Sequence, residues 1–194
     1  MKTRLYLARH GETLWNKKRR LQGHLNSQLT PLGKLQSAHI AEKLSAIGIN
    51  TIISSPLERA VETAFICQQA FNIPHKTYNS LLERNLGDWQ GKDVSYLQTL
   101  PEYNELLNQV TSLTINNAES ALDCGKRIFS ALQQLANAHL GQNSLIIFHG
   151  EAMRCLFFLL GQTQTTNAFN LFANGCIVAL DYQQTPPYFT IKEN

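Results

Sequence analysis

Three short apolar segments of this chain each end in polar residues directly before a helical pattern, and this arrangement restricts the possible folds strongly. Strands that alternate with helices form largely parallel sheets. Ligands of such sheets bind beyond the carboxyl ends of the strands. The pattern therefore predicts an α/β fold with a binding site where these strands end. The segments and their polar ends are Thr3 to Ala8 with Arg9-His10-Gly11, Thr51 to Ser54 with Ser55 and the later Arg59, and Ser144 to Phe148 with His149-Gly150.

The first two segments are followed by helical patterns with recognisable beginnings. Thr30-Pro31 predicts an N-cap with proline in the first helical position, and Gly48 predicts the end of that helix. Ser55-Pro56-Leu57-Glu58 predicts a capping box for a second helix that runs to about Phe71. The residues expected to face the core are Leu32, Leu35, Ala38, Ala41, Leu44 and Ile47 in the first helix, and Val61, Ala64, Phe65 and Ile66 in the second.

The remaining chain continues the alternation and shows no internal repeat or linker. A chain of 194 residues with this pattern predicts a single domain over residues 1–194. The further elements expected are two short helices between Asp93 and Val110, a long amphipathic helix from Glu119 to His139, a helix from Glu151 to Leu160, and two closing strands, Cys176 to Asp181 and Tyr188 to Lys192.

Composition and charge restrict the class of protein. Hydrophobic residues make up 43% of the chain, which is enough for a sizeable core. A net charge of +3 favours small anionic ligands over an extended nucleic-acid surface. No apolar run reaches the length that spans a bilayer, and Arg9 interrupts the N-terminal apolar stretch too early for a signal peptide. The four cysteines form no C-x-x-C pair, so we expect reduced thiols in a cytoplasmic protein.

The polar strand ends have the chemistry of a phosphate site. If the three strands are parallel neighbours, Arg9, Arg59, His10 and His149 converge on one cleft. Guanidinium groups offer forked donors that match phosphate oxygens. A neutral imidazole can attack phosphorus with its free ring nitrogen. The sequence therefore predicts phosphate binding, with a histidine positioned to react.

The motif Arg9-His10-Gly11-Glu12-Thr13, with Trp15-Asn16 close behind, resembles the opening motif of the histidine phosphatase superfamily. The resemblance covers residues 5 to about 160 and implies a three-layer α/β/α fold with a mostly parallel central sheet, the phosphoglycerate-mutase-like fold. Asn26, Ala118 and Phe148 depart from common family residues, but none belongs to the catalytic set. The further motifs, in the family's order, are Gln22-Gly23, Leu29-Thr30, Ser54-Ser55-Pro56-Leu57 with Arg59, Glu83, Gly87-Asp88-Trp89, Glu119-Ser120 and His149-Gly150.

The resemblance implies a metal-independent phosphomonoester hydrolase that forms a phosphohistidine. A small phosphorylated metabolite is the expected partner, without a cofactor, a metal, nucleic acid or a membrane. The sequence leaves the substrate and the oligomeric state open. The implied site residues are His10, Glu83 and His149 in catalysis, Arg9, Arg59, Asn16, Gly11 and Gly150 around the phosphate, and Gln22 and Gly23 against the rest of the substrate.

Alternatives remain open for individual residues. Glu12, Glu119 and Glu151 compete with Glu83 for the role of general acid and base. His10-Gly11-Glu12 and His149-Gly150-Glu151 each read H-x-E, but the chain lacks the H-x-x-x-H spacing of zinc hydrolases. Arg59 has two possible roles, a phosphate ligand or an ion pair with Glu58 or Glu62. Lys17-Lys18-Arg19-Arg20 fits either a solvated face or a nucleic-acid patch. The aromatic residues Trp89, Tyr96 and Tyr103 fit either a pocket wall or the core.

Alternatives also remain for the function as a whole. The segment between Glu83 and Glu119 is short, and a lid too short to exclude water favours hydrolysis over phosphate transfer. The alternatives are a 2,3-bisphosphoglycerate-dependent phosphoglycerate mutase and a catalytically silent phosphate-binding module. The intact set of His10, Glu83, His149 and two arginines favours catalysis.

Overall fold

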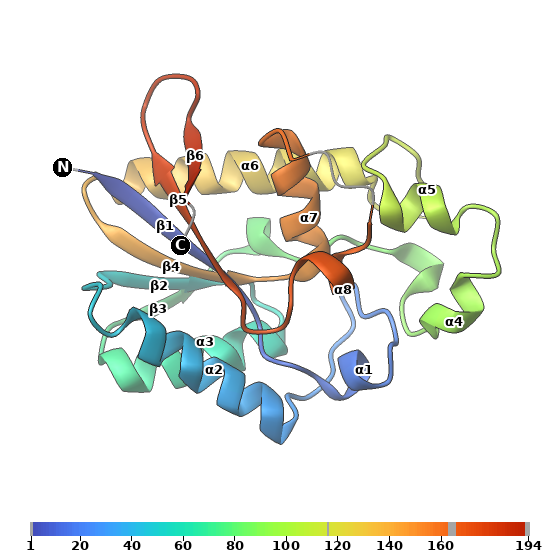
Figure 1. Ribbon diagram of the computed structural model, residues 1–194, viewed down its shortest axis with the longest axis horizontal. Coiled ribbons are helices and arrows are strands. Elements are labelled where there is room, and N and C mark those ends of the chain that lie inside the picture. The colour runs from blue at the N-terminus through green and yellow to red at the C-terminus, as the bar shows by residue number, and fades with distance from the viewer. Residues whose placement is uncertain (1, 116, 163–165, 193–194) are drawn as a thin grey trace.

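The computed structural model describes residues 2–115, 117–162 and 166–192. A six-stranded sheet has the order β3-β2-β4-β1-β5-β6 (Figure 1). Strands β3, β2, β4 and β1 pair in parallel, and β5 is antiparallel to both of its neighbours, β1 and β6. The strands are β1 (Thr3–Arg9), β2 (Thr51–Ser54), β3 (His75–Thr77), β4 (Asn143–Phe148), β5 (Ile177–Tyr182) and β6 (Phe189–Lys192).

Helices cover both faces of the sheet. Figure 1 shows α2 (Pro31–Leu44) and α3 (Glu58–Phe71) on one face, and α6 (Ala121–Ala138) and α7 (Gly150–Leu159) on the other. The predicted three-layer α/β/α fold with a mostly parallel sheet is confirmed. None of the helices in the described ranges is long and apolar enough to cross a membrane. The shorter helices are α1 (Leu14–Lys17), α4 (Val94–Leu97), α5 (Tyr103–Asn108), α8 (Ala168–Leu171) and two 3-10 turns, Asn79–Leu81 and Gly87–Trp89.

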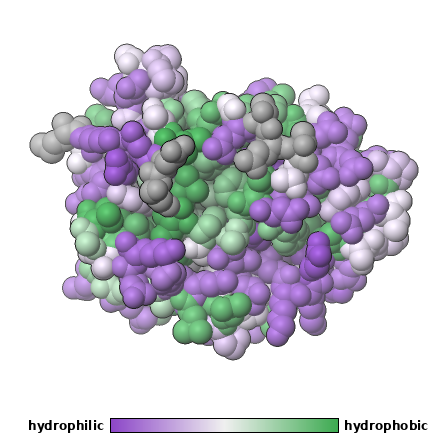
Figure 2. Space-filling view, in the orientation of Figure 1, coloured by the Kyte–Doolittle hydropathy of each residue, from purple (hydrophilic) through white to green (hydrophobic). Residues whose placement is uncertain are grey.

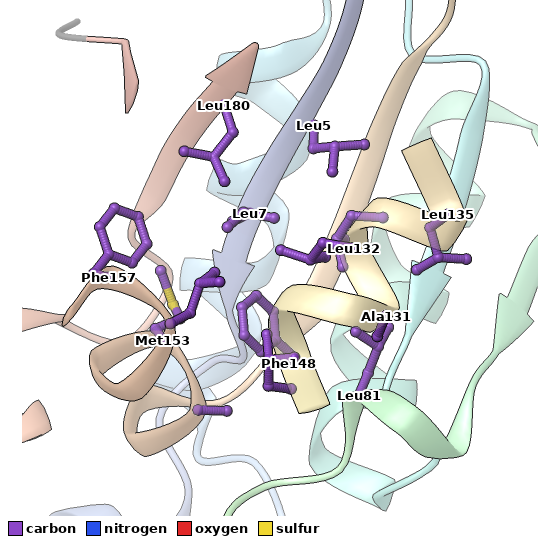
Figure 3. Close-up of a cluster of buried hydrophobic side chains, with 14 of the residues drawn as sticks. Leu5, Leu7, Leu81, Ala131, Leu132, Leu135, Phe148, Met153, Phe157 and Leu180 are labelled. Carbon is purple, nitrogen blue, oxygen red and sulfur yellow. The ribbon is translucent and has the colours of Figure 1, made fainter. Parts of the chain in front are cut away.

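The central strand β1 supplies side chains to both layers of the core. Leu5 and Leu7 pack under α6 and α7, where they meet Leu132 (Figure 3). Tyr6 and Ala8 point to the other face, toward α2 and α3. Successive strand residues point to opposite faces, so a strand between two helical layers has to be apolar throughout. Each buried leucine stabilises the fold by about 1.5–3 kcal/mol.

Helix α2 has the predicted beginning, but its end and part of its buried face differ from the prediction. Thr30 accepts a hydrogen bond from the Gly33 N–H, as an N-cap does. The helix ends at Leu44, and Gly48 follows a turn. Leu32 and Leu35 are 50% and 68% exposed, and Figure 2 shows an apolar patch over the N-terminal end of α2. Ala41 and Leu44 are buried as predicted, and Gly33, Ser37 and Ile40 complete the buried face.

The reason is a close backbone contact at Gly33. A Cβ atom there would lie 2.1 Å from the carbonyl oxygen of Glu12, so this glycine has to face the loop after β1. Once Gly33 faces inward, residues four and seven or eight positions later follow it on the same side of the helix. A hydrophobicity pattern alone does not contain this steric requirement.

Helix α3 also differs from its prediction at both its beginning and its inner face. It starts at Glu58 after Leu57, without a side-chain cap, so the predicted capping box is wrong. Phe65, expected to be buried, is 52% exposed. Because Arg59 turns inward, its neighbours at helical spacing turn inward with it. The buried residues are Arg59, Ala60, Thr63, Ala64 and Cys67.

The candidate active site

The polar ends of β1, β2 and β4 meet in one pocket. These three strands are parallel neighbours in the order β2-β4-β1, as the strand-end pattern requires. The empty space in and above this pocket, part of it open to solvent, amounts to about 390 Å³. Its lining residues are Arg9, His10, Asn16, Arg20, Leu21, Gln22, Gly23, Arg59, Glu83, Leu86, Gly150, Glu151, Ala168 and Phe169.

Two contacts define the tautomer of His10. Its Nδ1–H donates to the carbonyl oxygen of Gly11 over 2.8 Å, and its Nε2 accepts from Nε of Arg59 over 3.2 Å. Burial, and then the positive charges of Arg59 and Arg9, hold the pKa of His10 well below its usual range. The imidazole is therefore neutral, with the lone pair of Nε2 on the side of Arg59, in the pocket lining.

Arg59 projects from the first turn of α3 and is 1% exposed. Besides His10, it donates to the carbonyl oxygens of Leu25 (2.9 Å) and Gly23 (2.7 Å). The alternative ion pair with Glu58 or Glu62 is not formed, and Glu62 pairs with Lys34 instead. Burial lowers the pKa of Arg59 to about 10, so the guanidinium remains charged at neutral pH.

Arg9 lines the pocket as a second cation, whereas His149 packs against His10 outside the pocket lining. Burial, and then the charge of Arg59, hold the pKa of His149 well below its usual range, so its imidazole is neutral. Arg9 donates to the carbonyl oxygen of Phe172 and lies 5.6 Å from the ring centroid of Phe169. Within the described part of the chain, its buried Nε has no hydrogen-bond partner. The ring of His149 meets that of His10 edge-on, with centroids 5.3 Å apart, and both of its buried nitrogens lack partners among the described residues. Such buried polar atoms predict a ligand that hydrogen-bonds to them.

Glu83 lies across the N-terminus of α7. Its Oε1 accepts the N–H groups of Arg84 and Ala152, both at 2.8 Å, and its Oε2 accepts that of Glu151 at 3.3 Å. The carboxyl thus caps a helix whose own N-cap residue, His149, makes no side-chain cap bond. Burial, and next the negative charge of Glu151, raise the pKa of Glu83. A raised pKa favours the protonated form of a carboxyl, which is the form that donates a proton.

The other acidic candidates each have a different role. Glu12 accepts a hydrogen bond from the Thr30 hydroxyl, and Glu119 pairs with Arg127 over 2.8 Å. Glu151 lines the pocket, but Arg154 binds both of its carboxylate oxygens. Glu83 is the acidic candidate that lines the pocket and makes no salt bridge within the described part of the chain.

Asn16 and the predicted glycines occupy different surroundings. The Oδ1 atom of Asn16 accepts from Thr13 and from Asn174, which leaves its Nδ2 as a donor in the pocket lining. Gly150 lies beside Arg9, where a Cβ atom would approach the guanidinium within 3.1 Å. Gly11 is not in the pocket lining. It packs against the backbone of Gly33, and its N–H donates to Thr63.

Gln22 and Gly23, which the sequence predicts to contact the substrate, belong to the pocket lining. The carbonyl oxygen of Gly23 accepts from Arg59, and its φ of 52° is in the left-handed region that glycine tolerates best. Gln22 is 8% exposed. The neighbouring basic run is a solvated face through Lys17, Lys18 and Arg19, whereas Arg20 reaches the pocket.

The aromatic residues of the middle segment lie outside the pocket lining. Trp89 and Tyr103 are buried and stack on each other with ring centroids 6.3 Å apart, and Tyr96 is exposed. The core interpretation is therefore correct for Trp89 and Tyr103. Residue 116, at the end of this segment, lies outside the described residues.

Several lining residues were not predicted from the sequence. Ala168 and Phe169 belong to the short helix α8, which has no periodic pattern long enough to identify it. Asn174 donates through Nδ2 to the carbonyl oxygen of His10 (3.1 Å) and to Oδ1 of Asn16 (3.2 Å). The contact joins positions 164 and 158 residues apart, so no local sequence signal could reveal it.

The described ranges hold no group of three or more His, Cys, Asp or Glu side chains that could bind a metal ion. The charges that face His10 are the guanidinium groups of Arg9 and Arg59. The arrangement can hold an anion against a neutral imidazole, with a carboxyl of raised pKa in the same pocket.

Comparison with known proteins places this geometry in a family. The chain is 34% identical over 185 residues to a probable phosphoglycerate mutase GpmB from Yersinia pestis (strain Pestoides F), which covers 94% of this chain and 86% of that protein. The structure of Bacillus stearothermophilus YhfR aligns with a TM-score of 0.86 and 28% identity, over 97% of this chain and 94% of that one.

A second solved structure, the α-ribazole phosphatase from Shigella flexneri, aligns with a TM-score of 0.79 and 26% identity, over 97% of this chain and 94% of that one. The family model described as the histidine phosphatase superfamily (branch 1) matches residues 5–192. The chain is therefore an enzyme of the histidine phosphatase superfamily, the family that its sequence motifs resemble.

Proposed function

We propose that this enzyme is a metal-independent phosphomonoester hydrolase that acts on small phosphorylated metabolites through a phosphohistidine at His10. The observation that carries the proposal is the tautomer of His10. Its Nδ1–H is bound to the Gly11 carbonyl, and its Nε2 lone pair faces a guanidinium in the pocket lining. A neutral imidazole held in this tautomer is the form that attacks phosphorus.

In the first step, Nε2 of His10 forms a bond to phosphorus and the bond from phosphorus to the ester oxygen breaks. The leaving alkoxide takes the proton of Glu83, so the alcohol departs neutral. In the second step, the Glu83 carboxylate takes a proton from water, whose oxygen attacks phosphorus. The bond from nitrogen to phosphorus then breaks, which releases inorganic phosphate and restores neutral His10 and protonated Glu83.

The surrounding groups stabilise charge on the phosphoryl oxygens during both steps. Arg9 and Arg59 supply the positive charge, while His149 and Nδ2 of Asn16 supply further donors. These side chains are held in place before the substrate arrives, which is the condition under which fixed donors lower a barrier most. The positions of these groups support their assignment to the transferring phosphate.

Two kinds of relative bear on the reaction. The Shigella flexneri protein is named as an α-ribazole phosphatase, and the Yersinia pestis protein as a probable phosphoglycerate mutase. The mutase reaction is the second candidate, because it uses the same phosphohistidine and differs in the acceptor that takes the phosphate back.

The test is the release of inorganic phosphate from a panel of phosphomonoesters, measured in EDTA with the wild-type enzyme and with His10→Ala. The panel contains 3-phosphoglycerate, sugar phosphates, α-ribazole phosphate and a chromogenic aryl phosphate. We expect release that resists EDTA and falls to background in His10→Ala. A matched control is His39→Ala, because His39 is an exposed histidine on α2 that contacts Glu42.

The same samples distinguish the second candidate. Formation of 2-phosphoglycerate from 3-phosphoglycerate in the presence of 2,3-bisphosphoglycerate, without phosphate release from any ester, would replace the hydrolase by the mutase. Absence of both activities, with retention of phosphate binding, would favour a catalytically silent module.

A further inference from the structure

Glu151 is a buried acid in the pocket lining that the proposed mechanism does not use. It lies in the first turn of α7 and is 8% exposed. Its Oε1 accepts from Nε of Arg154 (3.0 Å) and its Oε2 from Nη2 of the same guanidinium (2.9 Å). A buried carboxylate with a bidentate arginine partner is a fixed negative charge. Although burial opposes its ionisation, the Arg154 guanidinium holds the pKa of Glu151 below its usual range.

The same residue also holds the segment that carries the general acid. The N–H of Glu151 donates to Oε2 of Glu83 over 3.3 Å, and Nη1 of Arg84 lies 3.5 Å from Oε2 of Glu151. Glu151 therefore contacts two consecutive residues, Glu83 through its backbone N–H and Arg84 through its carboxylate. Arg84 is itself 1% exposed and donates to the carbonyl oxygens of Glu119 and Leu106.

The charges around Glu83 make Glu151 distinctive. It is the acidic side chain whose negative charge raises the pKa of Glu83. Its negative charge opposes ionisation of Glu83, whereas the cations favour it. The other charged and titratable groups around Glu83 are Arg9 and His10 in the same pocket, His24 in the loop after α1, Arg59 on α3, Arg84 next in the chain and Arg127 on α6. Glu119 is paired with Arg127.

We propose that Glu151 is a positioning residue that orients Glu83 toward the pocket and keeps its carboxyl protonated for the leaving group. The inference rests on the proposed hydrolase mechanism, in which Glu83 donates that proton. It also explains an otherwise costly arrangement. Three buried charges, Arg84, Glu151 and Arg154, carry a desolvation penalty that often exceeds their mutual attraction.

The experiment compares wild type and Glu151→Gln on two substrates. An alkyl phosphate needs a proton on its leaving oxygen, whereas p-nitrophenyl phosphate has a leaving group that is stable as an anion. Loss of the negative charge makes Glu83 ionise at lower pH, so the alkaline limb of kcat/KM for the alkyl ester moves to lower pH. On that limb we expect a loss of about tenfold or more for the alkyl ester and a much smaller loss for the aryl ester.

Glu151→Gln leaves two buried arginines without their anion, so folding has to be tested separately. The double variant Glu151→Gln with Arg154→Gln removes a charge of each sign. It is expected to show a smaller shift in the same direction, because Glu151, and not Arg154, is among the charges that set the pKa of Glu83. Asp181→Asn is the stability control, because Asp181 pairs with Lys2, Arg4 and Lys192 and is absent from the pocket lining. It should lower the Tm and leave the pH profile unchanged.

A second readout does not need activity. Carbon-13 NMR of the Glu83 side-chain carboxyl reports its titration midpoint directly, and we expect a lower midpoint in both Glu151 variants than in wild type. An unchanged midpoint, or equal losses on both substrates at every pH, would overturn the inference. Failure of the hydrolase proposal has a separate signature, namely no activity that depends on His10, and in that case the midpoint alone decides about Glu151.

Discussion

Nε of Arg59 donates a hydrogen bond to Nε2 of His10 over 3.2 Å, so a guanidinium is held against the nitrogen that would attack phosphorus. The contact has two consequences. A positive charge so close disfavours protonation of His10, and it attracts the phosphate of a substrate to the same point. The remaining guanidinium nitrogens bind the carbonyl oxygens of Leu25 and Gly23, so the residue also holds the loop that closes one side of the pocket.

Arg59→Lys should therefore impair the reaction although it keeps the charge. A lysine cannot donate to His10 and to two loop carbonyls at once, because its donors diverge from a single nitrogen. We expect kcat/KM to fall by about 10²–10³-fold, as for loss of a fixed donor in an active site. Steady-state kinetics measures this, with Arg20→Lys at the pocket mouth as the matched control. A loss below threefold for Arg59→Lys would show that charge alone suffices.

Glu83→Gln should change how stability depends on pH. The pKa of Glu83 is raised in the folded state by burial and by Glu151. A carboxyl of this kind stabilises the folded state below its unfolded pKa, and that contribution is lost as the pH rises through the folded pKa. Glutamine does not titrate, so the stability of the variant relative to wild type should increase from about pH 4.5 towards neutral pH.

Urea unfolding of both proteins across this pH range measures the difference directly. A constant difference in the free energy of unfolding would contradict a raised pKa. Activity toward an alkyl phosphate should fall by about 10²–10⁴-fold in the same variant, because the proton donor is gone.

Asn174→Ala should reduce activity more than stability. Its amide joins the carbonyl oxygen of His10 to Oδ1 of Asn16, and both contacts are to residues of the pocket. Loss of a partly buried hydrogen bond costs about 0.5–1.5 kcal/mol of stability. We expect kcat/KM to fall about tenfold, because a displaced Asn16 no longer donates to the phosphate. Asn170→Ala on the neighbouring helix α8, where Asn170 contacts Thr166, is the control. Comparable kinetics for the two variants would argue against this role.

Gly33→Ala should destabilise the fold by several kcal/mol. The new Cβ atom would lie 2.1 Å from the carbonyl oxygen of Glu12, so α2 would have to move away from the loop that follows β1. Gly48→Ala is a matched control, because Gly48 has a φ of 71° but nothing within 4 Å of its Cβ position. The control should cost about 1 kcal/mol from backbone strain. Thermal unfolding that ranks the two variants in the opposite order would refute the steric argument.

The sequence by itself determined the local elements and the chemistry at the strand ends. Features that depend on neighbours in the chain can be predicted from the hydrophobic and polar pattern of the sequence. They include the apolar strands, the Thr30 cap and the polar residues after β1, β2 and β4. Parallel pairing then brings His10, Arg59 and His149 together without further information.

Only the tertiary structure decided which faces of α2 and α3 are buried and which acid serves the pocket. Gly33 turns inward because it packs closely against the backbone of Glu12, and Arg59 turns inward because it binds His10 in the pocket. Both partners are distant in the chain. Among four candidate glutamates, Glu83 lies in the pocket lining and binds backbone N–H groups of α7. Glu119 and Glu151 pair with arginines, and Glu12 binds the Thr30 hydroxyl outside the pocket lining. Hydrophobic periodicity records the composition of one segment. Steric contacts and charge pairs depend on residues brought together by folding, and therefore they appear only in three dimensions.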